Sequence, residues 1–231
     1  MRDHDDDEDA GAEEDWSDVD QPEEEKKRPD PVFIVLSDDG GLVVDRSMIE
    51  TLHERSYFGK IDDATKLLFL YPEEILIFSE RNRLLAVKDK SIEAAMAMLP
   101  EIKQKWDEKG IEAFASDPRF LVPEALFKHF QDHVPDFWEK YVVYRDLKTR
   151  GYIVRRGIKD ISHFRVYKKG VKKGDEPAKF IYFGIFEGKP VSLAKLHEIS
   201  DYAMNNRQDL ILAVVDRQMD ITYYNVKKQD V

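Results

Sequence analysis

The sequence predicts an α/β protein of mixed α+β type, with a small N-terminal α/β domain and a C-terminal domain in which helices flank a central mixed sheet. Short apolar runs of strand length alternate along the chain with segments whose apolar residues recur at helical spacing. Turn signals such as the Asp-Asp-Gly-Gly at 38–41 separate these runs. The run 210–215 is apolar throughout, which is typical of a strand in the centre of a sheet.

The N-terminal folded region is expected to extend from residue 32 to residue 109. Its apolar runs predict strands at 32–36, 42–44, 67–71 and 84–87. Apolar spacing predicts helices at 48–55, 73–79 and 91–99, with Pro72 suited to a first helical turn and Ser91 to an N-cap. Residues 110–136 contain helix formers interrupted by three prolines, and we interpret them as a helical linker.

The C-terminal folded region, 137–231, opens with a predicted helix at 137–150, which Gly151 would end as its C′ residue. Strands are predicted at 152–154, 164–167, 180–186, 210–215 and 221–226. A second helix is predicted from Ser192 to about Asn205, and residues 155–157 are expected to form a turn.

The negative charge is concentrated at the N-terminus. The first 29 residues hold 14 Asp and Glu against 4 Lys and Arg, and the rest of the chain holds 33 against 32. A segment of that composition cannot bury enough apolar surface to offset the entropy of ordering, so residues 1–31 are expected to be a disordered acidic tail. The tail either improves solubility or mimics RNA and covers a basic groove. The net charge of −11 therefore does not argue against a nucleic-acid partner.

The composition also indicates the cellular compartment in which the protein is expected. There is no Cys, which excludes disulfides and thiolate metal sites and suits a reducing environment. No apolar run approaches the roughly 20 residues that span a bilayer, and the acidic N-terminus is unlike a signal peptide. We expect a cytoplasmic protein that does not contact membranes.

Several short motifs follow one another in a characteristic order. They are Leu70-Tyr-Pro-Glu-Glu74, Tyr141-Val-Val-Tyr144, Arg150-Gly-Tyr152, Phe164-Arg-Val-Tyr167, Leu210-Ile-Leu-Ala-Val-Val-Asp216 and Asp220-Ile-Thr-Tyr-Tyr224. This ordered set resembles the tRNA-splicing endonuclease (tRNA-intron endonuclease) family of the archaeal type, and it covers roughly residues 32–229. The resemblance implies a nuclease-like C-terminal domain that acts on precursor tRNA.

The resemblance implies a cleavage reaction that needs no metal and no cofactor. A ribose 2′-OH attacks the adjacent phosphate and leaves a 2′,3′-cyclic phosphate and a 5′-OH, so the chain would be part of a lyase. This chemistry needs a base, an acid and a cation beside the pentacoordinate phosphate, roles that the family gives to a Tyr, a His and a Lys.

Of these three family residues, only the Tyr has an identical counterpart in this sequence. The family Tyr corresponds to Tyr167, which ends the Phe-x-Val-Tyr strand. Lys179 is the nearest match to the family His, and no His occurs between His163 and His197. Gln208 takes the place of the family Lys. Since a lysine (pKa about 10.4) is a poor acid beside an imidazole (about 6.5), and glutamine has no charge, we expect a structural, non-catalytic subunit in which Tyr167 is vestigial.

A structural subunit would position a catalytic partner in a hetero-oligomer, expected to be a heterotetramer. The resemblance implies two contacts: pairing of the last strand, which carries Ile221 and Tyr223, and insertion of the acidic loop with Asp216 and Asp220 into a basic cleft of another subunit. A strand used only internally and a solvated hairpin turn are the alternatives. Arg155, Arg156, Lys168 and Lys169 are candidates for contacts with RNA phosphates, or they form an ordinary charged surface.

Three other functions stay open. The first is an active endonuclease that uses substitute groups such as Lys179 and His197. The second is a metal-dependent nuclease built on Asp175, Glu176 and Lys179, although one loop rarely supplies converging carboxylates. The third is an RNA-binding or assembly module that has no enzymatic role.

Overall fold

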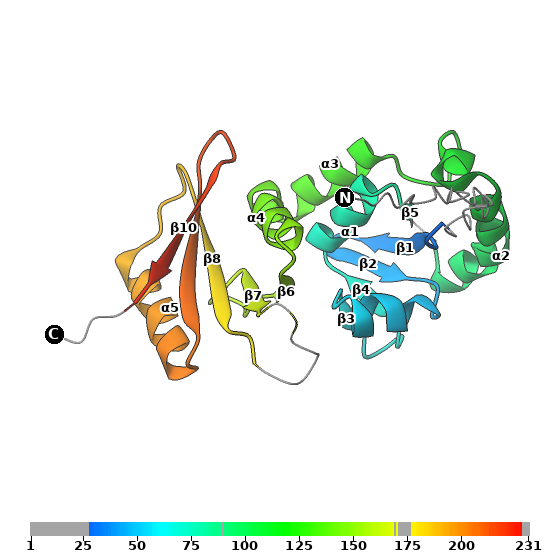
Figure 1. Ribbon diagram of the computed structural model, residues 1–231. Coiled ribbons are helices and arrows are strands. Elements are labelled where there is room, and N and C mark those ends of the chain that lie inside the picture. Colours follow the sequence, from blue (N-terminus) through cyan, green and yellow to red (C-terminus); the bar gives the residue numbers. More distant parts are fainter. Residues whose placement is uncertain (1–27, 89, 169, 171–176, 228–231) are drawn as a thin grey trace, which may run out of the picture.

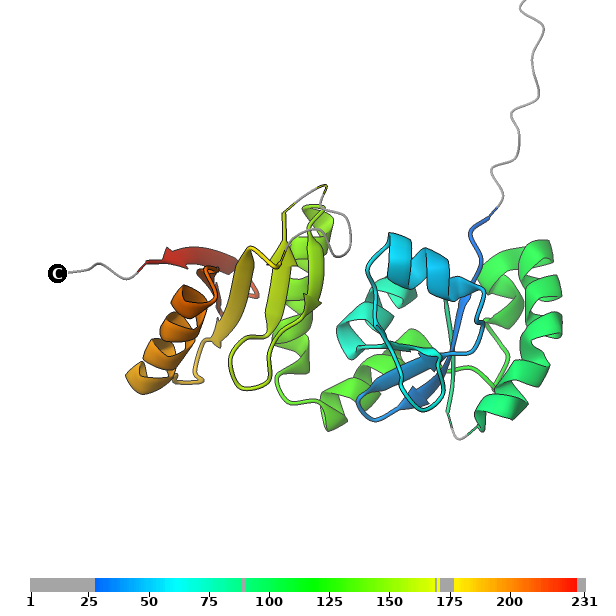
Figure 2. The same cartoon turned by 90° about the horizontal axis from the view of Figure 1, so that it is seen from below.

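The computed structural model describes residues 28–227 except 89, 169 and 171–176. Two five-stranded sheets, each with helices packed against it, form two lobes (Figure 1). In the turned view, α2 and α5 lie on the outer flanks and α4 lies between the sheets (Figure 2). The predicted α+β class with two mixed sheets is confirmed.

The N-terminal sheet has the order β3-β4-β2-β1-β5. Its strands are β1 (Val32–Ser37), β2 (Gly40–Val43), β3 (Lys60–Ile61), β4 (Leu68–Leu70) and β5 (Leu84–Val87). β1 pairs antiparallel with β2 and parallel with β5. Successive side chains of β1 enter two different cores, because Ile34 packs toward α1 and Phe33 packs toward α2.

Helices cover both faces of this sheet. They are the π-helix η1 (Glu50–Arg55), α1 (Pro72–Glu80), α2 (Ile92–Lys109), the 3-10 helix η2 (Gly110–Phe114) and α3 (Pro123–His133). The prediction that the helix beginning at Ser91 ends at residue 99 is wrong, because α2 continues through Pro100 to Lys109. Ile102 and Trp106 on the continued helix are almost fully buried, and their packing outweighs the hydrogen bond that the proline cannot make.

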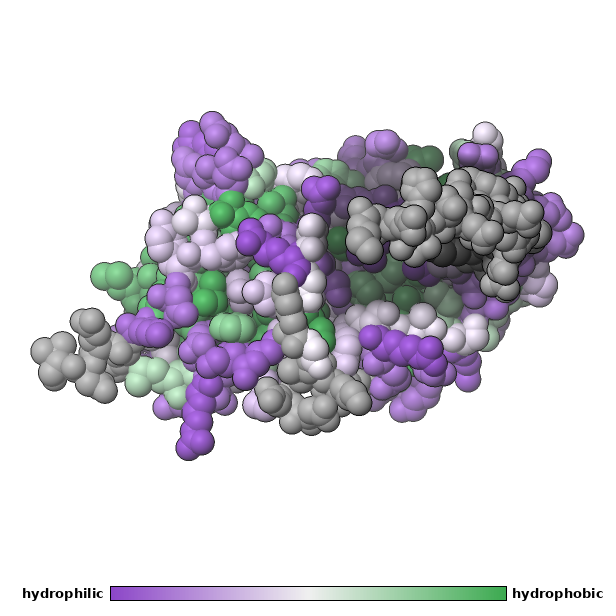
Figure 3. All heavy atoms as spheres, viewed as in Figure 1, coloured by the Kyte–Doolittle hydropathy of each residue, from purple (hydrophilic) through white to green (hydrophobic). Residues whose placement is uncertain are grey.

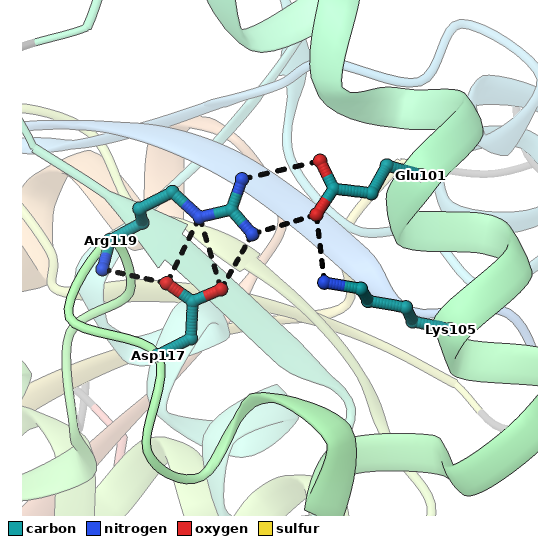
Figure 4. A network of polar contacts seen from close by, with 4 residues as sticks. All are labelled: Glu101, Lys105, Asp117 and Arg119. Atoms are coloured by element: carbon teal, nitrogen blue, oxygen red, sulfur yellow. Dashed lines mark hydrogen bonds and ion pairs between the residues drawn. The ribbon is translucent and has the colours of Figure 1, made fainter.

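A partly exposed ionic cluster connects α2 to the segment that follows η2. The Arg119 guanidinium donates to Asp117 at 2.6 Å and to Glu101 at 2.9 Å, and Lys105 reaches the same Glu101 carboxylate at 2.8 Å (Figure 4). These cations hold the pKa of Glu101 at about 2. Because these side chains remain in contact with solvent, their ion pairs add little to the free energy of unfolding. Their main effect is to hold the segment after η2 against α2.

The C-terminal sheet has the order β10-β9-β8-β7-β6. Its strands are β6 (Ile153–Arg156), β7 (Phe164–Tyr167), β8 (Phe180–Phe186), β9 (Asp209–Val215) and β10 (Ile221–Val226). β8 and β9 are parallel over seven residue pairs, and all other neighbours are antiparallel. The predicted turn at 155–157 is wrong in part, since Arg155 and Arg156 belong to β6.

One helix covers each face of this second sheet. α5 (Leu193–Asn205) begins at Ser192, whose hydroxyl accepts the Lys195 N–H at 3.1 Å, as an N-cap does. α4 (Phe137–Thr149) packs on the other face, and its buried side chains join one core that also includes α1 and α3. α4 therefore connects the two lobes. No helix in the described part of the chain has the length and apolar character that a membrane span requires.

The buried hydroxyl of Tyr144 on α4 predicts an unusual effect on stability. Tyr144 is 2% exposed, and within the described residues its hydroxyl has no hydrogen-bond partner. Tyr144→Phe removes this unsatisfied group and should raise the free energy of unfolding by about 1 kcal/mol in urea titration. Tyr223→Phe is the matched control, because the Tyr223 hydroxyl donates to Asp146 at 2.7 Å and its loss should lower stability. A Tyr144→Phe variant less stable than the parent would contradict the prediction.

Candidate nuclease site

The sheet register gathers the three predicted site positions at one end of the C-terminal sheet. Tyr167 is the last residue of β7, and its neighbour Val166 pairs with Phe180 on β8. Phe180 pairs in turn with Asp209 at the start of β9, so Lys179 and Gln208 both immediately precede this pair. Adjacent strands lie about 4.8 Å apart, and the three side chains therefore originate from neighbouring strands at the same edge.

Lys179 is engaged with a carboxylate. Its ammonium lies 2.8 Å from Asp209 Oδ2, and both side chains are about one third exposed. The Asp209 N–H also donates to the Lys179 carbonyl at 3.0 Å, so the pair is fixed at the start of both strands. The carboxylate of Asp209 balances the positive charge of the ammonium. Lys179 is therefore not a free cation.

Gln208 links the same two strands through its amide. Its Nε2 donates to the carbonyl of Ala178 at 2.8 Å, and its backbone N–H donates to Ala203 at the end of α5. Arg207, which precedes it, has a φ of 54° and makes the tight connection from α5 to β9. The side chain at this position therefore holds the strand starts together and contributes no positive charge.

The two histidines nearest in sequence to this end lie elsewhere. His163 precedes β7, four residues from Tyr167 along an extended strand, which is about 13 Å. Its ring stacks on Phe183 and Phe186 with interplanar angles of 13° and 12°, and its Nδ1 accepts the Gly184 N–H at 2.8 Å. His197 is exposed on α5 and pairs with Asp201 at 2.8 Å.

A hollow between the lobes has a mixed but predominantly basic lining. It encloses about 500 Å³ and is lined from α1, α4, β6, the β6–β7 loop, β7, β8 and α5. Its charged side chains are Glu73, Lys140, Arg156, Lys159, Asp160 and Lys195. Burial raises the pKa of Glu73 and lowers the pKa of Lys140, because both charges are partly removed from water. We call this hollow the interlobe pocket.

The opposite end of the C-terminal sheet forms an acidic tip. Asp216 Oδ1 accepts the N–H groups of Gln218 and Asp220 at 2.8 and 3.0 Å, which closes the β9–β10 turn. Arg217 lies 3.0 Å from Glu187, a carboxylate that the sequence analysis did not consider. Because Glu187 neutralises Arg217, the tip keeps the charges of Asp216 and Asp220. Figure 3 shows this hairpin end as a hydrophilic projection from the lobe.

β10 is the edge strand of the sheet within this chain. Ile221 and Tyr223 point to the α4 face, where the Tyr223 ring packs against Tyr182 at 5.8 Å. Tyr224 points away and is 55% exposed. The strand therefore has one paired side, toward β9, and one side where another strand can pair.

The candidate RNA-binding residues do not form one patch. Arg155 donates to the Gly59 carbonyl of the N-terminal lobe, and the Arg156 guanidinium lies 4.7 Å from the centre of the Tyr71 ring. Arg156 lines the interlobe pocket, whereas Lys168 follows Tyr167 at the other end of the β6–β7 hairpin. Lys169, and Asp175 and Glu176 of the metal-dependent alternative, lie outside the described residues.

Known proteins share sequence with this chain, both in the C-terminal lobe and over most of its length. Residues 137–223 match the family described as "tRNA intron endonuclease, catalytic C-terminal domain". The chain is 27% identical to the "tRNA-splicing endonuclease" of Thermococcus kodakarensis over 196 residues, which are 85% of this chain and 97% of the relative. It is 32% identical to the protein of that name from Pyrococcus abyssi over 120 residues, 52% of this chain and 68% of the relative. The chain belongs to the tRNA-splicing endonuclease family.

A longer relative of the same name has a higher identity over a shorter stretch. The Methanococcoides burtonii tRNA-splicing endonuclease is 40% identical over 103 residues, which are 45% of this chain and 28% of that protein. The family assignment confirms the resemblance that the ordered motifs indicated. The individual roles of Tyr167, Lys179 and Gln208 stay predictions.

The environment of His163 predicts a loss of stability in acid. Burial lowers its pKa to about 4, and Lys140 and Arg156 act in the same direction. The unfolded chain therefore binds a proton near pH 6.5 that the folded chain does not, so this stabilisation is complete above 6.5 and decreases as the pH falls toward 4. Urea unfolding should show that the parent loses about 2 kcal/mol more between pH 7 and pH 5 than His163→Asn does. The oxygen of the new amide can still accept the Gly184 N–H, and equal losses in both proteins would contradict the assignment.

Proposed function

We propose that this chain is a structural subunit of a tRNA-splicing endonuclease and works with a catalytic partner to remove introns from precursor tRNA. The observation that carries the proposal is the composition of the sheet end at Tyr167. Gln208 and a neutralised Lys179 stand where the reaction would need a cation and an imidazole. The reaction on the partner would leave a 2′,3′-cyclic phosphate and a 5′-OH.

The chemistry explains why these two replacements matter together. Attack of a ribose 2′-OH builds negative charge on the phosphate and on the leaving 5′-oxygen. A general acid contributes roughly 10²–10⁴-fold, and its loss is not offset by a lysine held as a cation beside Asp209. A neutral amide at Gln208 offers no charge to the phosphorane. Tyr167 alone would then be a base or an orienting group without an acid.

Assembly with a partner is supported by two surfaces. The free side of β10 can pair with a strand of another subunit, and the area around Tyr224 adds apolar contact. The acidic tip, with Asp216 and Asp220, suits a basic cleft on the partner, because a buried carboxylate needs a cation to meet it. The interlobe pocket of this chain is such a cleft and could receive the corresponding acidic loop of another subunit.

Contact with precursor tRNA would be made through phosphates. Lys168 lies beside Tyr167 and faces solvent, and Arg156 reaches the interlobe pocket from β6. Such contacts position an RNA without reading its sequence, and they weaken with salt. In this proposal the structural subunit holds part of the substrate while the partner cuts.

Restoring the missing groups tests the proposed role. The triple variant Lys179→His, Gln208→Lys, Asp209→Asn supplies an imidazole and a cation and removes the carboxylate that would neutralise the new lysine. With a precursor tRNA and no partner, we expect the parent chain to cleave no faster than the uncatalysed background, and the triple variant to cleave at least about 10²-fold faster than that background. Adding Tyr167→Phe to the triple variant is the matched control and should abolish the gained cleavage. Cleavage by the parent chain alone would overturn the structural role.

Removing two charges from the acidic tip tests assembly. Asp216→Asn with Asp220→Asn removes the charges but keeps a side-chain oxygen at position 216 as an acceptor for the turn N–H groups, so the hairpin is preserved. Size-exclusion chromatography with a co-expressed catalytic subunit should show dissociation, or at least a tenfold weaker complex. The exposed pair Glu93→Gln with Asp107→Asn makes the same change of charge elsewhere and should leave assembly intact. An unaltered elution profile for the tip variant would remove this contact from the proposal.

A further inference from the structure

A cluster of potential metal ligands lies in the N-terminal lobe, away from the nuclease site. His129 and His133 are four residues apart on α3, and Asp38 lies in the turn between β1 and β2. One ligand atom of each residue lies within 4.8 Å of the other two. Two imidazoles and one carboxylate form a donor set that suits late first-row divalent metals such as Zn²⁺. Residues at i and i+4 share one face of a helix, so α3 presents both rings together.

Hydrogen bonds to backbone carbonyls determine which nitrogen each ring can offer. His133 Nδ1 lies 2.7 Å from the His129 carbonyl, and His129 Nε2 lies 3.0 Å from the Ser37 carbonyl. A carbonyl only accepts, so each of these nitrogens carries the proton. The free lone pairs are therefore on His133 Nε2 and His129 Nδ1. Metal-binding histidines typically have this arrangement, in which a backbone carbonyl holds the other ring nitrogen.

The distance between His133 and Asp38 also suits a bridging ion. His133 Nε2 lies 3.6 Å from Asp38 Oδ1, which is too far for a good hydrogen bond. Two ligands of a tetrahedral zinc ion, each at about 2.0–2.1 Å, are separated by about 3.4 Å. His129 is only 8% exposed, whereas the His133 and Asp38 side chains are 39% and 75% exposed, so one side of the site is rigid and the other is open to solvent.

We propose that Asp38, His129 and His133 bind one divalent transition-metal ion, with water completing the coordination. The bound ion would connect the β1–β2 turn to α3, adding to the contact that His129 already makes with Ser37. Its role is structural and not hydrolytic, because the site belongs to the N-terminal lobe and shares no residue with the sheet end at Tyr167. The proposal does not depend on whether the chain is a structural or a catalytic subunit.

Isothermal titration of the full-length, chelator-treated chain with ZnCl₂ tests the site. We expect one ion per chain, and Co²⁺ in place of Zn²⁺ should give the visible absorption of a four- or five-coordinate complex. Asp38→Asn and His133→Gln alter the exposed ligands and should weaken binding at least tenfold while leaving the metal-free unfolding temperature close to that of the parent. The added Zn²⁺ should raise the unfolding temperature of the parent and not of His133→Gln.

The matched control is His197→Gln, which changes another exposed histidine that lies near a carboxylate on a helix. This variant should bind Zn²⁺ like the parent. The proposal is overturned if the parent binds no ion at submillimolar concentrations, if Asp38→Asn and His133→Gln bind as tightly as the parent, or if His197→Gln is the variant that loses binding.

Discussion

The parallel register of β8 and β9 determines both ends of the C-terminal lobe. Seven consecutive pairs, from Phe180 with Asp209 to Phe186 with Val215, place the starts of the two strands at one edge and their ends at the other. β8 and β9 lie side by side along their whole length (Figure 1). Lys179 and Gln208 therefore precede neighbouring strand ends beside Tyr167, while Glu187 at the other end pairs with Arg217 of the acidic tip. Both strands are apolar almost throughout, because α4 covers one face of the sheet and α5 covers the other.

The basic residues of β6 make contacts within the protein that would compete with the proposed binding of RNA. Arg155 donates to Gly59 and Arg156 lies over Tyr71, and both contacts join the C-terminal sheet to the N-terminal lobe. A guanidinium held between lobes is less available to an RNA phosphate than one in solvent. Arg155 and Arg156, which the sequence suggested as contacts for RNA, thus partly stabilise the arrangement of α4 and the two sheets. The same arrangement encloses the interlobe pocket.

Local sequence patterns predicted most helices and strands of this fold. Where the predictions were wrong or missed a contact, the reason is a tertiary contact that the local sequence does not show. The apolar run Phe164–Tyr167 and the Ser192 cap indicated correct elements because their signals lie within a few residues. The predicted end of α2 at residue 99 was wrong, because the burial of Trp106 on the continued helix compensates for the hydrogen bond that Pro100 cannot make. The partners of the site residues were also hidden, since Asp209 and Glu187 meet Lys179 and Arg217 only through strand pairing. The His129-x₃-His133 spacing was visible in the sequence, but Asp38 is far from it along the chain and only the fold brings it near.

The charge balance at Tyr167 follows from these same pairings. An active site for phosphate cleavage requires net positive charge at the position of the developing dianion. In this chain the ammonium that precedes β8 is matched by a carboxylate from β9, and the position before that carboxylate holds a neutral amide. The Lys179–Asp209 pair and Gln208 together therefore carry no net charge, although the backbone geometry around them is that of a nuclease family. This geometry without the matching charges is what the proposed role requires, in which the chain holds a catalytic partner and does not itself cut RNA.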